Sequence, residues 1–240
     1  YTVRDLIDRV GPPEAQEAID DELPELLERM PVDALVGQPG DTHGGYRRLD
    51  QDVQQSHLEV SLEIATMLGE ELTGEPARLE HLAGACATDE DTSNDADCVE
   101  DFIRQFGLLA HRRPLTDEDV TFYVSVFNDP GTDPAAFRDV IAVMLTSPHF
   151  LYHVEHGAGP AEGAPEDVRA LDDWELANRL SYHFWQSMPD AQLMEAARRG
   201  ELREEEGWRA QVDRFFEDPK TARSMASFYR EWLWMDELPQ

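Results

Sequence analysis

Apolar side chains recur at intervals of three and four residues along most of the chain, which is the spacing of an amphipathic helix. The longest run lies within residues 50–72, and further runs follow one another from residue 99 to the carboxyl end. Residues that cap helices stand before several runs, among them Thr116, Asp133 and Asp190. No segment alternates convincingly between apolar and polar residues. The pattern therefore predicts an all-α fold, an irregular multi-helix bundle of two to three small helical subdomains with long loops.

Clusters of glycine, proline and polar residues interrupt the helical pattern and indicate where domains divide. Residues 13–30 predict one or two short helices broken at Pro24, residues 31–48 a long Gly/Pro-rich loop, and residues 73–98 a second break. A linker rich in Gly, Pro and Ala covers residues 157–165. We therefore expect three domains: an N-terminal helical domain (1–75), a central helical domain with a cysteine-closed acidic loop (76–157) and a C-terminal helical domain (158–240).

The chain is strongly acidic, with 51 Asp and Glu residues against 20 Lys and Arg residues and a formal net charge of −31. This charge repels nucleic acid and anionic membranes, so we expect neither as a partner. Because no run of about 20 apolar residues occurs, we expect no membrane span. The acidic surface is interpreted as a solvated face, with cation binding as the alternative. The first residue is Tyr1 rather than Met, so we expect a mature or excised chain.

The two cysteines, Cys86 and Cys98, are close in sequence and enclose a polar, acidic segment. We expect a disulfide between them, which would imply an oxidising compartment. Two free thiols in a cytosolic protein are the alternative. The chain lacks a Cys-x-x-Cys-His sequence, so any c-type haem is expected in a separate module.

The acidic segment between and after the cysteines has the ligand spacing of an EF-hand calcium loop. Asn94 occupies the position that normally requires glycine, and Ala96 replaces the usual bulky aliphatic residue. A solvated acidic loop is the alternative to a calcium site. Oxygen-bearing residues fill positions 1, 3, 5, 7, 9 and 12 of the candidate calcium loop, namely Asp89, Asp91, Ser93, Asp95, Asp97 and Glu100.

A histidine-rich stretch follows Ser147, which can cap a helix, and Pro148, which suits the first helical position. In a helix, His149, His153 and His156 would lie on one face at i, i+4 and i+7. Three imidazoles on one face could bind zinc, copper or a haem iron, with a fourth ligand such as His183 from elsewhere. The alternative is that these histidines form the solvent-exposed edge of a core helix.

Ordered motifs over nearly the whole chain resemble those of the planctomycete-type cytochrome-associated proteins. These are large extracytoplasmic proteins of planctomycetes, myxobacteria and relatives, built from consecutive domains of unknown function. The motifs that carry the resemblance are Tyr1-Thr2-Val3-Arg4-Asp5-Leu6, residues 106–116, residues 147–152 with Glu155, residues 175–185, Met188-Pro189-Asp190 and Trp232-Leu233.

The resemblance implies a helical module of a secreted or periplasmic protein of unknown activity. This module would accompany a c-type cytochrome redox module that acts on an external substrate. Its implied partners are other domains of the same protein or a cytochrome module, with carbohydrate as a further candidate. The resemblance also implies that residues 158–240 are a truncated domain. His153 stands where the family typically has arginine, so the histidine stripe would be particular to this chain.

Two other functions stay open: a non-catalytic binding or scaffold module of the cell envelope, and a metalloprotein that uses the three histidines. The sequence does not decide whether the chain is an enzyme. The charged members of the motifs are interpreted as Arg–carboxylate pairs that tie helices together, with catalytic carboxylates as the alternative. These charged residues are Arg113, Glu155, Glu175 and Arg179.

Overall fold

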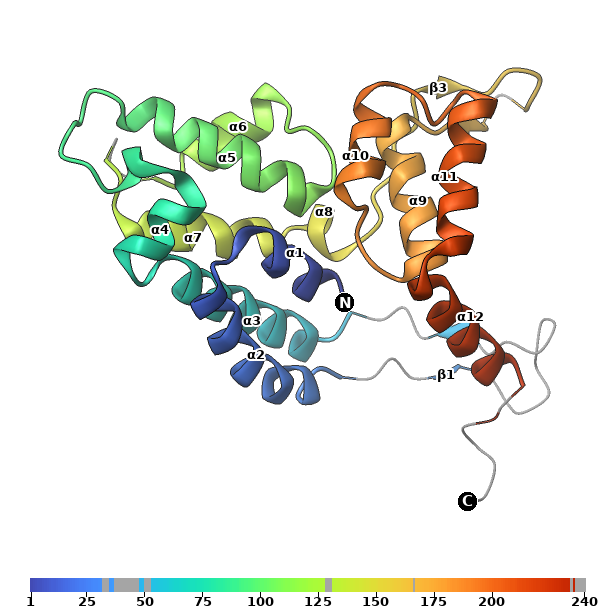
Figure 1. Ribbon diagram of the computed structural model, residues 1–240, viewed down its shortest axis with the longest axis horizontal. Coiled ribbons are helices and arrows are strands. Elements are labelled where there is room, and N and C mark those ends of the chain that lie inside the picture. Colours follow the sequence, from blue (N-terminus) through green and yellow to red (C-terminus); the bar gives the residue numbers. More distant parts are fainter. Residues whose placement is uncertain are drawn as a thin grey trace. The chain divides into compact units, whose positions relative to one another are not determined.

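The structure is a computed structural model. It describes residues 1–31, 35–36, 48–49, 53–127, 131–165, 167–233 and 235. Within these residues the protein is all-α, as the sequence predicted, with twelve α-helices, one short 3-10 helix and two small antiparallel strand pairs (Figure 1). The long loop predicted over residues 31–48 lies mostly outside the described residues.

The chain divides into two compact units. The N-terminal unit comprises Val3–Pro31 and Val53–Val154, and the C-terminal unit comprises Tyr1–Thr2, Val32–Asp52 and Glu155–Gln240. The sequence predicted a domain boundary at residues 157 and 158, close to the point where the second unit resumes. The long helix near residue 60 and the helix near residue 140, which the sequence assigned to different domains, lie in the same unit.

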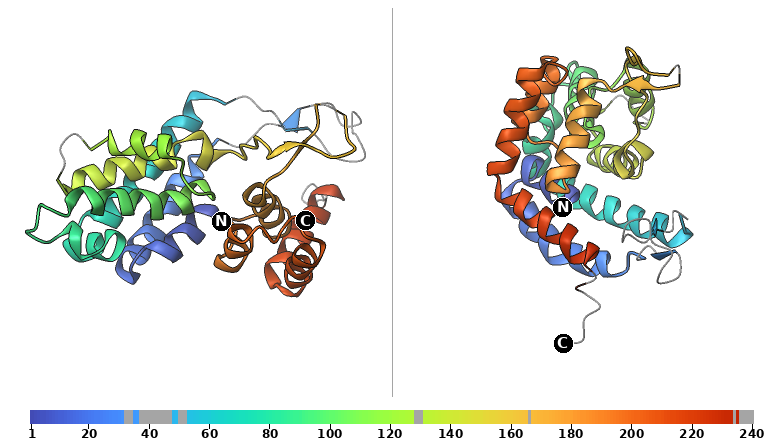
Figure 2. Two further views of the ribbon diagram at one scale, coloured as in Figure 1. Left: turned by 90° about the horizontal axis from the view of Figure 1, so that it is seen from above. Right: turned by 90° about the vertical axis from the view of Figure 1, so that its right-hand side faces the viewer.

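Helices build the described part of the N-terminal unit (blue to yellow in Figures 1 and 2). In chain order they are α1 (Thr2–Val10), α2 (Pro13–Glu28), α3 (Gln55–Thr73), α4 (Pro76–Ala83), the 3-10 helix η1 (Ala85–Ala87), α5 (Asp95–His111), α6 (Asp117–Val124), α7 (Pro134–Leu145) and α8 (Pro148–Leu151).

The core of this unit forms where α3 packs along α2 and α7, and where α5 packs against α4, α6, α7 and α8. Gly69 allows α3 and α7 to approach closely, because a Cβ atom there would lie 2.9 Å from the carbonyl oxygen of Arg138. Phe102 of α5 meets Phe137 of α7 edge to face, with ring centroids 5.0 Å apart. Both phenylalanines are buried, so the apolar stripes of α5 and α7 predicted from the sequence face each other.

Four helices and two strand pairs make up the described part of the C-terminal unit (orange to red helices in Figure 2). Its core is built around Trp185, which is buried against Phe215 with ring centroids 4.2 Å apart. Strand β1 pairs with β2 through Leu35 and Leu49, and β3 pairs with β4 through Gly159 and Ala170. In chain order the elements are β1 (Leu35–Val36), β2 (Arg48–Leu49), β3 (Gly159–Pro160), β4 (Arg169–Ala170), α9 (Asp173–Trp185), α10 (Ala191–Arg198), α11 (Glu205–Glu217) and α12 (Pro219–Trp232).

Two predicted breaks in the helical pattern are wrong. Helix α2 continues through Pro24, which is exposed, while Ile19 and Leu23 are buried and hold the helix to the core. Packing of these apolar residues outweighs the backbone hydrogen bond that proline removes. The predicted break at residues 73–98 contains α4, which begins with Pro76 at its first position and buries Leu79. One buried leucine in an eight-residue helix is too weak a periodic signal to read from the sequence.

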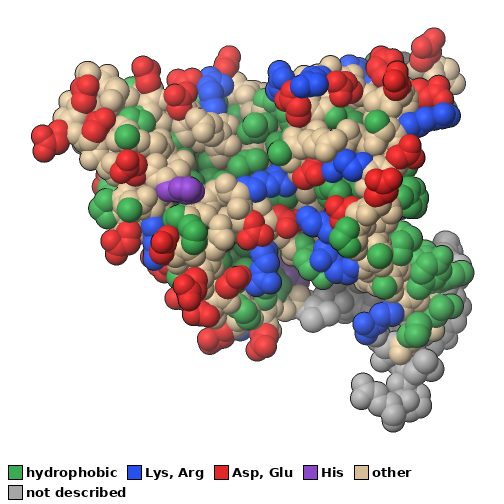
Figure 3. Space-filling view, in the orientation of Figure 1, with side chains coloured by type: hydrophobic (Ala, Val, Ile, Leu, Met, Phe, Trp, Pro, Cys, Tyr) green, Lys and Arg blue, Asp and Glu red, His purple; other side chains and the backbone are tan. Residues whose placement is uncertain are grey.

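The surface carries the acidic excess that the composition requires. Asp and Glu side chains are spread over both units on the face shown in Figure 3, with Lys and Arg side chains between them. None of the helices in the described residues is long and apolar enough to cross a membrane.

Cys86 of η1 and Cys98 of α5 form the predicted disulfide, with their Cα atoms 5.9 Å apart. Replacing both cysteines by serine is expected to lower the free energy of unfolding by about 3 kcal/mol. Without the disulfide, the loop of about a dozen residues is no longer closed, and the unfolded chain gains conformational entropy. Urea unfolding followed by far-ultraviolet circular dichroism measures this loss. A reducing agent should destabilise the natural chain and leave the double-serine variant unchanged. If reduction leaves the unfolding midpoint of the natural chain unchanged, the disulfide does not contribute to stability.

Candidate functional site

Arg112 joins two of the sequence motifs in the N-terminal unit. It ends α5 in the left-handed backbone conformation, with φ 57°, and its side chain is buried. Its guanidinium donates to the carbonyl oxygens of His149 at 2.6 Å, Phe150 at 3.1 Å and Tyr152 at 3.1 Å. Three carbonyl groups in and just after α8 thus receive their hydrogen bonds from one cation. The contact fixes α8 against the end of α5.

Beside this junction lies a group of polar side chains that we call the histidine cluster: His111, Tyr123, Ser147 and His149. The hydroxyl oxygen of Tyr123 lies 2.9 Å from Nε2 of His111, and the hydroxyl oxygen of Ser147 lies 3.3 Å from the same nitrogen. The imidazole of His149 stacks on that of His111, with ring centroids 5.0 Å apart. The cluster therefore brings together residues from α5, α6 and α8.

His111 and Tyr123 of the histidine cluster are held in their uncharged forms at neutral pH. Burial, the nearby His149 and the cation Arg113 lower the pKa of His111 to about 3, against an opposing effect of Asp119. Burial raises the pKa of Tyr123. Both side chains are almost fully buried, with exposed fractions of 4% and 3%. The phenol and the imidazole therefore share a buried hydrogen bond between neutral groups, and neither group is open to a substrate from solvent.

Ser147 acts as a cap rather than as a nucleophile. Its hydroxyl donates to the carbonyl oxygen of Met144 at 2.8 Å and accepts from the backbone N–H of Phe150 at 3.3 Å. The second contact is the N-cap bond of α8 that the sequence predicted from Ser147 and Pro148. With these bonds in place, the serine hydroxyl has no proton directed to His111.

In the C-terminal unit, two carboxylates from the motifs hold residues 155–157 against α9. Glu155 forms a two-bond ion pair with Arg179, with both N–O distances 2.6 Å. Glu175 accepts backbone N–H groups of His156 at 2.6 Å, Gly157 at 2.9 Å and Asp172 at 2.9 Å. Burial opposes ionisation of Glu175, but these N–H groups prevail and lower its pKa. Both carboxylates serve structural contacts.

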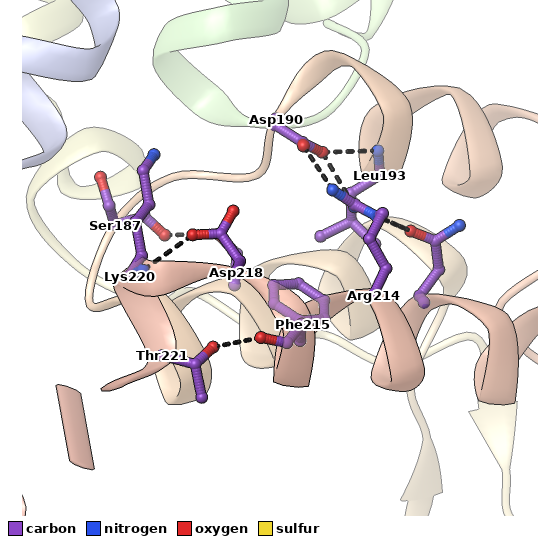
Figure 4. A network of polar contacts seen from close by, with 10 residues as sticks. Ser187, Asp190, Leu193, Arg214, Phe215, Asp218, Lys220 and Thr221 are labelled. Carbon is purple, nitrogen blue, oxygen red and sulfur yellow. Dashed lines mark hydrogen bonds and ion pairs between the residues drawn. The ribbon is translucent and has the colours of Figure 1, made fainter. Parts of the chain in front are cut away.

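A second polar network in this unit includes Asp190, Leu193 and Arg214 (Figure 4). Arg214 of α11 binds both carboxylate oxygens of Asp190, at 2.6 and 3.1 Å, and Asp190 in turn caps α10 through the N–H of Leu193. The guanidinium of Arg214 and the ammonium of Lys220 each lie 5.2 Å from the ring centroid of Trp185. The motif Met188-Pro189-Asp190 therefore anchors α10 to α11.

Comparison with protein-family models places the histidine cluster and the network around Trp185 within matched segments. Residues 98–155 match the model described as "PSD5: Protein of unknown function (DUF1595)", and residues 171–240 match "PSD4: Protein of unknown function (DUF1592)". The chain carries two consecutive domains of unknown function. The DUF1595 segment contains the histidine cluster, and the DUF1592 segment contains the network around Trp185. No curated protein and no solved structure matches the chain.

The predicted helical face of His149, His153 and His156 is wrong. Helix α8 ends at Leu151, and the next residue, Tyr152, is extended with φ −127° and ψ 164°. The carbonyl oxygens of His149 and Phe150, which would be acceptors in a longer helix, accept instead from Arg112. The N–H of His156 is likewise taken by Glu175.

The candidate calcium loop does not have an EF-hand course. Helix α5 already begins at Asp95, the seventh position, so Asp97 and Glu100 are helical, and Glu100 forms an ion pair with Arg104 at 2.7 Å. Before the helix, Asp89 accepts the backbone N–H of Asp91 at 2.8 Å. Within Asp91–Ser93, the carboxylate of Asp91 accepts both the backbone N–H and the hydroxyl of the serine, which lower its pKa. Short-range turns thus engage Asp89 and Asp91, two of the acidic side chains that calcium would require.

Among the residues that the structure describes, no group of three His, Cys, Asp or Glu side chains lies close enough together to hold a metal ion. This includes His183, the suggested fourth ligand, whose ring contacts Phe184 instead. Metal binding by these residues stays a prediction without geometric support.

Sequence reasoning assigned no role to Arg112, His111 or Tyr123. Their partners lie 12 to 40 residues away in the chain, so local spacing carries no signal for them. Of the charged pairs expected, Arg179 does bind Glu155, whereas Arg113 binds Asp119 at 2.8 Å within a capping box.

Proposed function

We propose that the chain is a helical module of a secreted or periplasmic multidomain protein that accompanies a c-type cytochrome module acting on an external substrate. Two consecutive matched domains support the multidomain arrangement. The disulfide between Cys86 and Cys98 supports an oxidising compartment, because cytosolic thiols are kept reduced. The cytochrome partner rests on the motif resemblance.

Within such a protein, this chain holds and positions its neighbours, and the redox chemistry takes place in the cytochrome module. This assignment of roles rests on one observation: the charged side chains that form several hydrogen bonds use them in structural contacts within the chain. Arg112, Glu175 and Arg214 each satisfy several groups of the chain itself. The same observation favours a second candidate function, a non-catalytic scaffold module of the cell envelope that has no cytochrome partner.

Purification of the natural full-length protein from its host tests both proposals. Fractionation with thiol labelling locates the protein and reports the state of Cys86 and Cys98, and a reduced-minus-oxidised absorption spectrum reports c-type haem. An extracytoplasmic, disulfide-bonded protein that copurifies with haem supports the first proposal. The same protein without haem supports the scaffold function. A cytoplasmic protein with free thiols contradicts both.

A further inference from the structure

A cavity of about 530 Å3 opens in the N-terminal unit beside the disulfide. It lies where the end of α3 and the start of α7 meet α4 and η1, and Leu79 and Ala87 form its buried apolar part. Pro134 and Ala135 add apolar surface from α7. The cavity is thus a pocket with an apolar lining, large enough for a small organic molecule.

The polar side chains of the pocket leave negative charge uncompensated. Arg138 is paired with Asp139, whose Oδ1 accepts from Nε at 3.0 Å and from Nη2 at 2.8 Å. Asp89 is engaged with Asp91 and Asn94. Glu70 lines the pocket, and within the described residues its carboxylate has no hydrogen-bond or ion-pair partner. An ammonium group beside Glu70 would compensate this charge.

We propose that this pocket binds a small organic cation with an apolar body. The apolar body packs against Leu79 and Ala87, which supplies the affinity, and the ammonium group lies next to Glu70, which supplies the preference for charge. Because Arg138 is neutralised by Asp139, an anionic ligand has no free partner of opposite charge there. This inference is independent of the proposed cytochrome partner and of the compartment.

Ligand titration of the full 240-residue chain tests the proposal. The probes are 2-phenylethylammonium, the neutral 2-phenylethanol and the anionic 3-phenylpropionate, at low and at high salt. We expect the cation to bind about threefold to fivefold more tightly than the alcohol at low salt, as befits one partly exposed ion pair, and the anion to bind most weakly. High salt should reduce the advantage of the cation.

Two glutamate variants distinguish the effect of the pocket carboxylate on cation binding from the effect of the protein's overall negative charge. Glu70→Gln should remove the preference for the cation and leave binding of the alcohol unchanged. Glu80→Gln makes the same change of charge at an exposed position of α4 that does not line the pocket, and should leave all three affinities unchanged.

A third variant, Ala135→Phe, fills the cavity and should abolish binding of all three probes, with a thermal melt to show that the chain still folds. The proposal is overturned if none of the probes binds, if the cation and the alcohol bind equally at low salt, or if Glu80→Gln weakens the cation as much as Glu70→Gln. Unchanged binding to a folded Ala135→Phe chain would also overturn it.

Discussion

Replacing Arg112 by alanine is expected to lower the free energy of unfolding by about 3–5 kcal/mol. The change removes charge-assisted hydrogen bonds to three carbonyl groups, each worth about 1.5–3 kcal/mol, and leaves those acceptors without their donor. Water entering the junction recovers part of the loss. Urea unfolding followed by far-ultraviolet circular dichroism measures the change.

The neighbouring Arg113 provides the matched control. Its ion pair with Asp119 is partly exposed, with side-chain exposures of 27% and 22%, so Arg113→Ala should cost no more than about 1 kcal/mol. Arg112→Lys keeps the charge but lacks the planar group that reaches several carbonyls, and should fall between the two alanine variants. Equal losses at positions 112 and 113 would show that the junction does not depend on the buried guanidinium.

Acid is expected to destabilise the protein through His111, whose folded pKa is about 3 against an ordinary value of 6.5. Between these two pH values the unfolded chain binds a proton at this imidazole that the folded chain excludes. The free energy of unfolding therefore falls as pH drops from about 6.5 toward 3, by about 1.4 kcal/mol per pH unit and about 5 kcal/mol in total. Unfolding titrations at several pH values measure this slope.

A variant separates the contribution of His111 to the pH dependence of stability from that of the carboxylates. The folded pKa of Asp119 lies at about 2, below its ordinary value of 3.8, so its stabilising effect is also lost on acidification, but only below about pH 4. Between pH 6.5 and 4.5, His111 should lower the free energy of unfolding of the natural chain by about 2–3 kcal/mol. The His111→Gln variant should not show this decrease. His81→Gln, at an exposed position of α4, should retain the slope. A slope that persists in His111→Gln would contradict the buried neutral imidazole.

Local signals in the sequence were sufficient for most of the helices. Thr116, Asp133 and Asp190 cap α6, α7 and α10 with side-chain bonds to the backbone, as predicted. The disulfide could also be predicted, because its cysteines are only 12 residues apart. In each case the residues that decide the structure lie near one another in the chain.

The candidate site was harder to predict because it depends on distant partners. The spacing of His149, His153 and His156 is helical, and nothing near them in the sequence stops a helix after Leu151. Arg112, about 40 residues away, donates to carbonyl groups that a longer helix would use as acceptors, and Glu175 accepts the N–H of His156. Spacing could not reveal these contacts with distant residues.

The contacts of Glu175 affect how the second domain could be exchanged between proteins. The matched segments leave residues 156–170 unassigned, yet the N–H groups of His156 and Gly157 bind a carboxylate of the DUF1592 segment, and β3 pairs with β4. A gene fusion that begins at residue 171 would discard these partners and leave the buried carboxylate of Glu175 with only the N–H of Asp172. We therefore expect that recombination preserves these contacts only when it cuts the chain ahead of Glu155.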